Sequence, residues 1–276
     1  VVDVGASFVA QFMIGALADM ETYIAYNALT ILCCAAIFPL TLTKAEQPAT
    51  PSAPRLRPAL AWRASPLAVA GVLVAAQSSA AFRMVGPIYG QEVGLQASQI
   101  GYFLAAYVAG GALAQYPVGW LADKFDRRWV LIWLSVAAII ACIVTVASAG
   151  MGTWAVMAAA TFFGLTTFPV YSVATAHAHD FISDEERIEL SAALMFFYAV
   201  GAIAAPYVSS KLMSGFGAGA LFTFISVGHL LLVIFGLMRM RVRSAPVTRT
   251  RYIYAPRTSF IVGRLLGRSR NRDQNE

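Results

Sequence analysis

Long apolar runs alternate with short polar breaks along this chain of 276 residues. A helix needs about twenty consecutive apolar residues to cross the ~30 Å hydrocarbon core of a membrane. Because every backbone amide in that core needs an internal partner, such runs are expected to be helices. The runs that reach or approach this length lie at residues 4–18, 23–42, 66–89, 99–118, 129–149, 152–176, 191–210 and 218–238. The pattern predicts an all-α polytopic membrane protein with about eight transmembrane helices.

The composition supports a membrane protein and offers no support for an enzyme. Only 12% of the residues are charged and 59% are hydrophobic, whereas an ordinary soluble domain has about 25% charged residues. Cys33 and Cys34 are adjacent and Cys142 is distant, so neither a disulfide scaffold nor a zinc knuckle is expected. The sequence holds no P-loop, nucleophile elbow or zinc-protease motif, and we expect no catalytic activity and no cofactor.

Lysines and arginines are concentrated on one predicted side of the membrane. Eighteen of the 20 fall in segment 43–65, in the loops after the fourth and sixth spans, and after Met238, whereas Lys211 lies opposite and Arg83 within a span. Excess positive charge in short loops marks the cytoplasmic face, so both ends of this chain are expected to be cytoplasmic. The sequence pI of about 9.4 follows from this asymmetry. It favours contact with anionic lipids, each nearby cation contributing about 1 kcal/mol, and not with nucleic acid.

The densest charge lies in "GWLADKFDRRWVL", which begins at Gly119. The glycine permits a tight turn or a close approach, and Asp123 is expected to accept amide hydrogen bonds at a helix N-terminus. Arg127 and Arg128 are placed to pair with Asp123, with Asp126 or with lipid phosphates. On composition alone, this segment is a positively charged anchor at the cytoplasmic face.

The spacing of these residues resembles the signature loop of the major facilitator superfamily of transporters. The matching residues are Gly119, Asp123, Lys124, Arg127 and Arg128. Asp126 stands where the family usually has glycine. In that family the loop braces one half of the transporter against the other in one access state. The resemblance therefore implies that these residues form a conformational latch, whose counterpart is the region around Val1 to Val4.

The resemblance also divides the chain. Residues 1–42 would be the last two helices of an N-terminal half, 43–65 a cytoplasmic linker, 66–240 a six-helix C-terminal half, and 241–276 a basic cytoplasmic tail. The segment "FPVYSVATAHAHD" is similar to its counterpart in the YcaD-like bacterial subgroup, which implies the bacterial inner membrane. Since the chain starts at a valine, the first four of twelve helices are expected to be missing.

Helices interrupted by glycine or proline point to the substrate site of a repeat-built transporter. Span 66–89 contains Gly86-Pro87, and span 152–176 contains Pro169. Polar residues at helical spacing lie near both interruptions. The substrate-cavity candidates are Ser79, Arg83, Thr167, Tyr171 and Thr175.

Each candidate also has a simpler explanation. Hydroxyl groups in membrane helices often bond their own backbone or a neighbouring helix, for about 0.6–2 kcal/mol. An ionised residue such as Arg83 is costly inside a bilayer and is a functional candidate by default. However, Arg83 lies about six residues from the predicted outer end of its span, roughly 9 Å at helical rise, where it could snorkel to the interface.

The three histidines are weaker signals. His177 and Asp180 can share a helix face, but His177 and His179 cannot on a regular helix, so no metal site is expected. His177 and His179 are placed at the cytoplasmic mouth, and His229 is expected to be packed inside. Apart from Asp3, the spans hold no carboxylate. A proton carrier, if one exists, would therefore be a histidine or lie in the missing helices.

Two functions are compatible with this sequence. The first is secondary active transport of a small solute by alternating access, with a coupling ion left open, in a truncated transporter. The alternative is a membrane scaffold or sensor that keeps the half-bundle fold without transporting.

The tail contains "SFIVGRLLGRSR", which is expected either to fold as an interfacial helix on an anionic leaflet or to remain a solvated basic segment.

Overall fold

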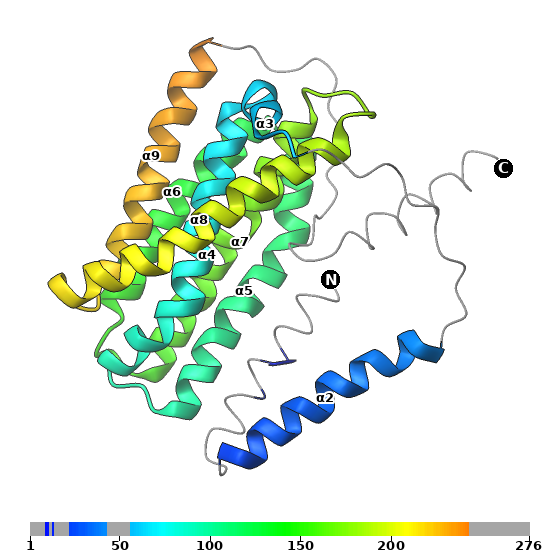
Figure 1. The fold of residues 1–276 in the computed structure, drawn as a ribbon. Helices are drawn as coiled ribbons and strands as arrows, with labels where there is room; N and C mark the ends of the chain where they lie inside the picture. Colours follow the sequence, from blue (N-terminus) through cyan, green and yellow to red (C-terminus); the bar gives the residue numbers. More distant parts are fainter. Residues whose placement is uncertain (1–8, 11–12, 14–21, 43–55, 243–276) are drawn as a thin grey trace.

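The computed structural model describes residues 9, 10, 13, 22–42 and 56–242, and this part of the chain contains helices and no strand (Figure 1). In chain order the helices are α2 (Thr22–Leu42), α3 (Pro58–Ala64), α4 (Pro66–Glu92), α5 (Ala97–Lys124), α6 (Arg127–Ala147), α7 (Thr153–His179), α8 (Arg187–Phe216) and α9 (Ala220–Val242). The six helices α4 to α9 are long and apolar enough to cross a membrane. They confirm the predicted all-α polytopic membrane fold.

The six later predicted spans coincide with α4 to α9, but several helices continue past the apolar runs. α5 reaches Lys124 and α8 reaches Phe216, each about six residues beyond the predicted edge. Because a helix projecting past the hydrocarbon core loses no backbone hydrogen bond, hydropathy alone underestimates its length. The predicted span 23–42 corresponds to α2, whereas the predicted span 4–18 falls almost entirely outside the described residues.

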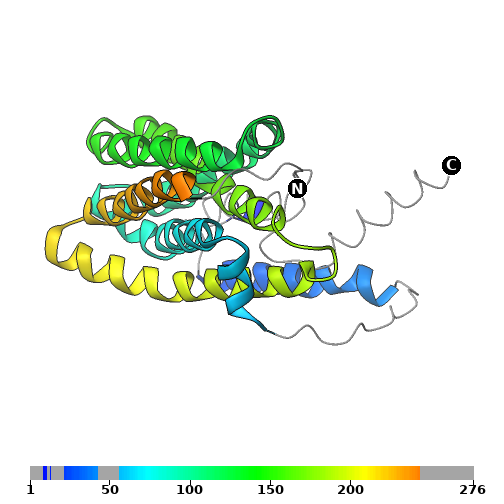
Figure 2. The same cartoon turned by 90° about the horizontal axis from the view of Figure 1, so that it is seen from above.

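α7 is the central helix of the bundle. Every residue from Thr166 to Thr175 is buried, and α7 packs against α4, α5 and α6. Figure 2 shows α8 along one side of the bundle, and its main partner among the long helices is α4. The two helices predicted to line a cavity, α4 and α7, are therefore neighbours, and α7 contacts protein on several sides.

Glycines allow α5 and α7 to approach closely. A Cβ atom on Gly110 of α5 would collide with the carbonyl oxygen of Thr161, and one on Gly164 of α7 would collide with that of Tyr107. Small residues at such positions are the usual means of close helix packing in membranes, where van der Waals contact replaces the hydrophobic effect. The α5–α7 contact is thus specified by these two glycines.

A short helix, α3, lies inside the segment predicted as a linker. Pro58 occupies its first turn, where a missing amide costs nothing, and Leu60 and Ala61 are buried. α3 packs mainly against α8, and two ion pairs join them: Arg57 Nη1 lies 2.9 Å from Glu189 Oε2 and Arg63 Nη2 lies 3.4 Å from Glu186 Oε1. The segment next to α4 is therefore attached to the bundle, while residues 43–55 lie outside the described residues.

Prolines interrupt four of the six long helices. Pro87, Pro117, Pro169 and Pro206 lie inside α4, α5, α7 and α8, whereas α6 and α9 contain none.

α2 stands apart from the bundle in Figure 1, and apolar side chains such as Tyr26, Ile31 and Phe38 are exposed on it.

Candidate functional site

The charged motif forms a two-residue connection between α5 and α6. α5 ends at Lys124 and α6 begins at Arg127, so only Phe125 and Asp126 join them. Asp126 has an extended backbone, with φ −63° and ψ 119°, and its carboxylate accepts a hydrogen bond from the amide of Arg128 at 3.0 Å. Asp126 is therefore the N-cap of α6.

The cap is not the residue that the sequence suggested. Asp123 was expected at a helix N-terminus, but it lies in the last turn of α5 because that helix runs on to Lys124. Asp126 also pairs with the side chain of Arg128, whose Nε and Nη2 lie 3.1 and 2.7 Å from Oδ2. An aspartate in place of the family's usual glycine thus supplies both a cap and an ion pair.

Arg127 is the buried centre of the motif. Its side chain is only 1% exposed, and Nη1 donates to Oδ1 of Asp180 at 2.6 Å. The same nitrogen donates to the carbonyl oxygen of Ala176 at 2.9 Å, and Nη2 lies 3.4 Å from Asp123 Oδ1. Since Asp180 and Ala176 belong to the end of α7, one guanidinium group fastens the α5–α6 connection to the central helix.

The sequence pointed to Arg127 but not to Asp180 as its partner. The two residues are 53 positions apart, and their pairing depends on how α6 packs against α7. One signal was present, since Asp180 is an acid four residues after a predicted span, on the same predicted side of the membrane as the motif. Among the pairings that the sequence left open, the structure shows Arg127 with Asp123 and Arg128 with Asp126.

The motif residues Lys124 and Gly119 differ in their surroundings. Gly119 is buried in the last part of α5. Lys124 is exposed, and its Nζ lies 4.7 Å from the ring centroid of Trp120, within range of a cation–π interaction. The motif therefore presents Asp123 and Lys124 outward and Gly119 and Arg127 inward.

The three cavity candidates of α7 are all buried. Thr167 donates to the carbonyl oxygen of Phe163 and Thr175 to that of Tyr171, each at 2.8 Å. The ring of Tyr171 packs edge-to-face on Tyr198 of α8 at 5.2 Å between centroids. Because both threonine protons are used within α7 itself, Tyr171 is the member of this stripe that connects α7 to another helix.

The two cavity candidates of α4 lie in different environments. Ser79 is 2% exposed, whereas Arg83 is exposed. Gln77, on another side of α4, donates to the carbonyl oxygen of Phe224 in α9 at 2.8 Å. α4 ends at Glu92, nine residues after Arg83, which is about 14 Å at helical rise. The arginine therefore lies deeper along its helix than the sequence suggested.

The histidines form internal contacts. His179 Nδ1 donates to the carbonyl oxygen of Thr175 at 2.8 Å, and its Nε2 lies 3.2 Å from Ser191 Oγ of α8. His229 Nε2 lies 3.0 Å from Ser78 Oγ in the interior. His177 packs edge-to-face against Phe181. Within the residues that the structure describes, no group of three or more His, Cys, Asp or Glu side chains is arranged to hold a metal ion.

The charged α5–α6 connection and the six spanning helices define a class of membrane transporter. A family model described as Major Facilitator Superfamily matches residues 67–270, and the chain belongs to this family. Curated relatives are named uncharacterized MFS-type transporter YcaD. The protein of Escherichia fergusonii is 28% identical over 221 residues, covering 79% of this chain and 56% of the relative.

Two further relatives carry the same name. YcaD of Escherichia coli O7:K1 is 30% identical over 200 residues, covering 71% of this chain and 51% of the relative. YcaD of Salmonella heidelberg is 30% identical over 195 residues, covering 70% and 50%. The chain thus spans about half the length of the curated relatives it matches, and the resemblance to the YcaD-like group is confirmed.

Proposed function

We propose that this chain forms the C-terminal half of a secondary transporter that moves a small solute by alternating access. Membership of the Major Facilitator Superfamily and the transporter name of the relatives support a transporter in general. The observation that carries the proposed mechanism is the buried Arg127–Asp180 ion pair. It fixes one end of the charged motif to α7 while Asp123 and Lys124 stay at the surface.

The latch consists of the outward part of this motif. The Asp123 side chain is 36% exposed, and Lys124 is exposed beside it. Arg127 fastens the α5–α6 connection to the central helix α7. A displacement of Asp123 or Lys124 is therefore passed on to α7. The proposed counterpart is the region around Val1 to Val4, which lies outside the described residues.

One face of α8 suits contact with the other half of a transporter. Phe196, Val200, Ile203 and Tyr207 are all exposed and follow the spacing i, i+4, i+7 and i+11 along one side of α8. Arg83 is exposed on α4, the helix against which α8 packs. An arginine within a predicted span is costly against lipid. We therefore propose that this side of the bundle faces a water-filled cavity and a second half.

Within the proposed cavity, Arg83 is the candidate for contact with a solute, because it is exposed whereas Tyr171 is buried against Tyr198. Thr167 and Thr175 keep their protons within α7, and Ser79 is buried behind the surface of α4. A guanidinium group binds carboxylates and phosphates strongly, so a solute with an acidic group is favoured. The end of the bundle with the charged motif is proposed to be cytoplasmic, in a bacterial inner membrane.

The test measures solute transport with the latch altered. Cells expressing the gene with its upstream reading frame are compared with cells carrying Asp123→Asn or the control Lys211→Gln, which removes a charge at the opposite end of the bundle. Mass spectrometry of the medium identifies solutes whose uptake or export depends on expression. We expect Asp123→Asn to abolish most of this change and Lys211→Gln to preserve it at equal protein levels in the membrane. If expression changes no solute, the chain is a scaffold or sensor instead.

A further inference from the structure

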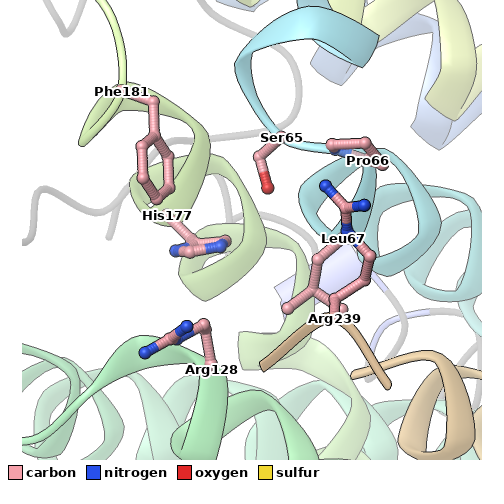
Figure 3. Close-up of a pocket in the computed structure, with 7 residues that line it drawn as sticks. All are labelled: Ser65, Pro66, Leu67, Arg128, His177, Phe181 and Arg239. Carbon is pink, nitrogen blue, oxygen red and sulfur yellow. The ribbon is translucent and has the colours of Figure 1, made fainter. Parts of the chain in front are cut away.

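A recess opens where four helices end beside one another. It is lined by Ser65, Pro66, Leu67, Arg128, His177, Phe181 and Arg239, around about 280 Å³ of open space. These residues come from the start of α4, the start of α6, the end of α7 and the end of α9. Figure 3 shows the two guanidinium groups, the imidazole and the serine hydroxyl gathered around this space. None of the cavity candidates on α4 or α7 lines it.

The lining carries positive charge without an acidic residue. Arg128 and Arg239 both line the recess, and His177 is a third nitrogen-bearing side chain beside them. Asp126 pairs with Arg128 from outside the lining. Arg239 makes no ion pair with any residue that the structure describes. Among the described residues the recess therefore keeps a net positive charge, to which the guanidinium of Arg239 contributes without an acidic partner in that part of the chain.

Ser65 provides a buried hydrogen-bond donor at the same place. Ser65 is only 3% exposed, and its Oγ accepts a hydrogen bond from the amide of Ala68 at 3.2 Å. A hydroxyl that accepts a hydrogen bond can also donate its own proton. Ser65 lines the recess, so this proton can be donated to a group bound there. The N-terminus of the 27-residue helix α4 adds a partial positive charge there.

We infer that this recess binds a phosphate group, supplied either by an acidic phospholipid or by a free phosphate. Arginine pairs bidentately with phosphate oxygens, a hydroxyl and a helix N-terminus complete the usual set of phosphate donors, and the recess supplies all three. The site lies at the opposite end of α4 from Arg83 and shares Arg128 with the charged motif.

A bound phosphate would hold the ends of α4, α6, α7 and α9 together. Arg239 lies in the last turn of α9, and Arg128 in the first turn of α6, next to the Arg127 that fastens the motif to α7. Binding should therefore stabilise the folded bundle, which provides a readout that does not depend on transport.

The first arm of the test uses inorganic phosphate and the full chain purified in a neutral detergent. Thermal unfolding is followed by tryptophan fluorescence while phosphate replaces chloride at constant ionic strength. Arg239→Gln removes a lining guanidinium, Arg239→Lys keeps its charge, and Arg241→Gln is the matched control, because Arg241 is exposed two residues further along α9 and outside the lining. We expect a saturable rise of the unfolding midpoint, with at least a tenfold weaker apparent affinity in Arg239→Gln and an unchanged one in Arg241→Gln.

The second arm places the same four proteins in nanodiscs of phosphatidylglycerol or phosphatidylcholine without added phosphate. A lipid headgroup is the source if phosphatidylglycerol stabilises the protein but inorganic phosphate does not. In that case Arg239→Gln should lose the stabilisation and Arg241→Gln should keep it. Response to inorganic phosphate identifies a site open to free phosphate. Equal behaviour of Arg239→Gln and Arg241→Gln in both arms would overturn the inference, since only general attraction between charges would remain.

Discussion

The guanidinium group of Arg127 lies 2.6 Å from the carboxylate of Asp180, and both side chains are at most 2% exposed. Removing one member of a buried ion pair leaves the other charge without compensation, at a cost of about 3–5 kcal/mol. We therefore expect Arg127→Gln to lower the thermal unfolding midpoint strongly in detergent. The double variant Arg127→Gln with Asp180→Asn should recover part of the loss, because no buried charge is then left alone.

The matched control for this prediction is Arg63→Gln. Arg63 pairs with Glu186 at 3.4 Å, but its side chain is 71% exposed, and exposed pairs contribute only about 0–1 kcal/mol. The prediction is wrong if both single variants shift the unfolding midpoint by the same small amount.

Asp126 should be replaceable by asparagine but not by alanine. Its carboxylate caps α6 through the amide of Arg128, and loss of an N-cap costs about 0.5–2 kcal/mol. Asparagine keeps a capping oxygen and loses only the charge opposite Arg128. We expect Asp126→Ala to lower stability more than Asp126→Asn in the same thermal assay. Equal losses would show that Asp126 stabilises the protein through its ion pair with Arg128 and not through the cap.

Gly110 should not tolerate even a methyl group. A Cβ atom there would overlap the carbonyl oxygen of Thr161, a backbone atom that cannot rotate away. Overpacking costs typically 1–3 kcal/mol, so Gly110→Ala should reduce the thermal midpoint and the yield of folded protein. Gly215→Ala is the control, since a methyl group there would meet nothing within 4 Å and alanine favours a helix by about 1 kcal/mol over glycine. A harmless Gly110→Ala would mean that α5 and α7 are not packed this closely.

The variant Arg83→Gln distinguishes a role of Arg83 in transport from simple snorkelling to the membrane interface. If it binds an acidic group or gates the cavity, Arg83→Gln should abolish uptake of the solute found by the medium comparison, with membrane insertion unchanged. The change removes a cation that binds acidic groups well but keeps a long polar side chain. Unimpaired uptake by Arg83→Gln would show that the arginine only reaches for the interface.

The helices were predictable because a membrane leaves few alternatives to apolar helical runs. What local sequence could not provide was the partner of a side chain. Asp180 meets Arg127 only after α6 and α7 have packed. The same limit applies to Asp123, whose place at the end of α5 depends on how far that helix projects past its apolar run.

Side-chain spacing also could not distinguish a row of polar side chains that face solvent from a row whose hydroxyl groups donate to their own helix. Thr167 and Thr175 follow the spacing expected of a cavity wall, yet each donates its proton to the carbonyl four residues earlier. α3 was not predicted for a different reason: its seven residues are too few to give a periodic pattern, and they lie in a segment rich in proline. The recess around Arg239 is built from four helix ends, and only Arg128 of its lining belongs to a motif visible in the sequence.

The distribution of prolines gives the bundle two kinds of helix. A proline inside a helix removes a backbone hydrogen bond and weakens resistance to bending at that point. α6 and α9 contain no proline and pack against each other, so they form a stiff spine. α4, α5, α7 and α8 each lack one backbone hydrogen bond at their internal proline. The six helices therefore differ in their intrinsic resistance to bending, and the two with an uninterrupted hydrogen-bond ladder are neighbours in the bundle.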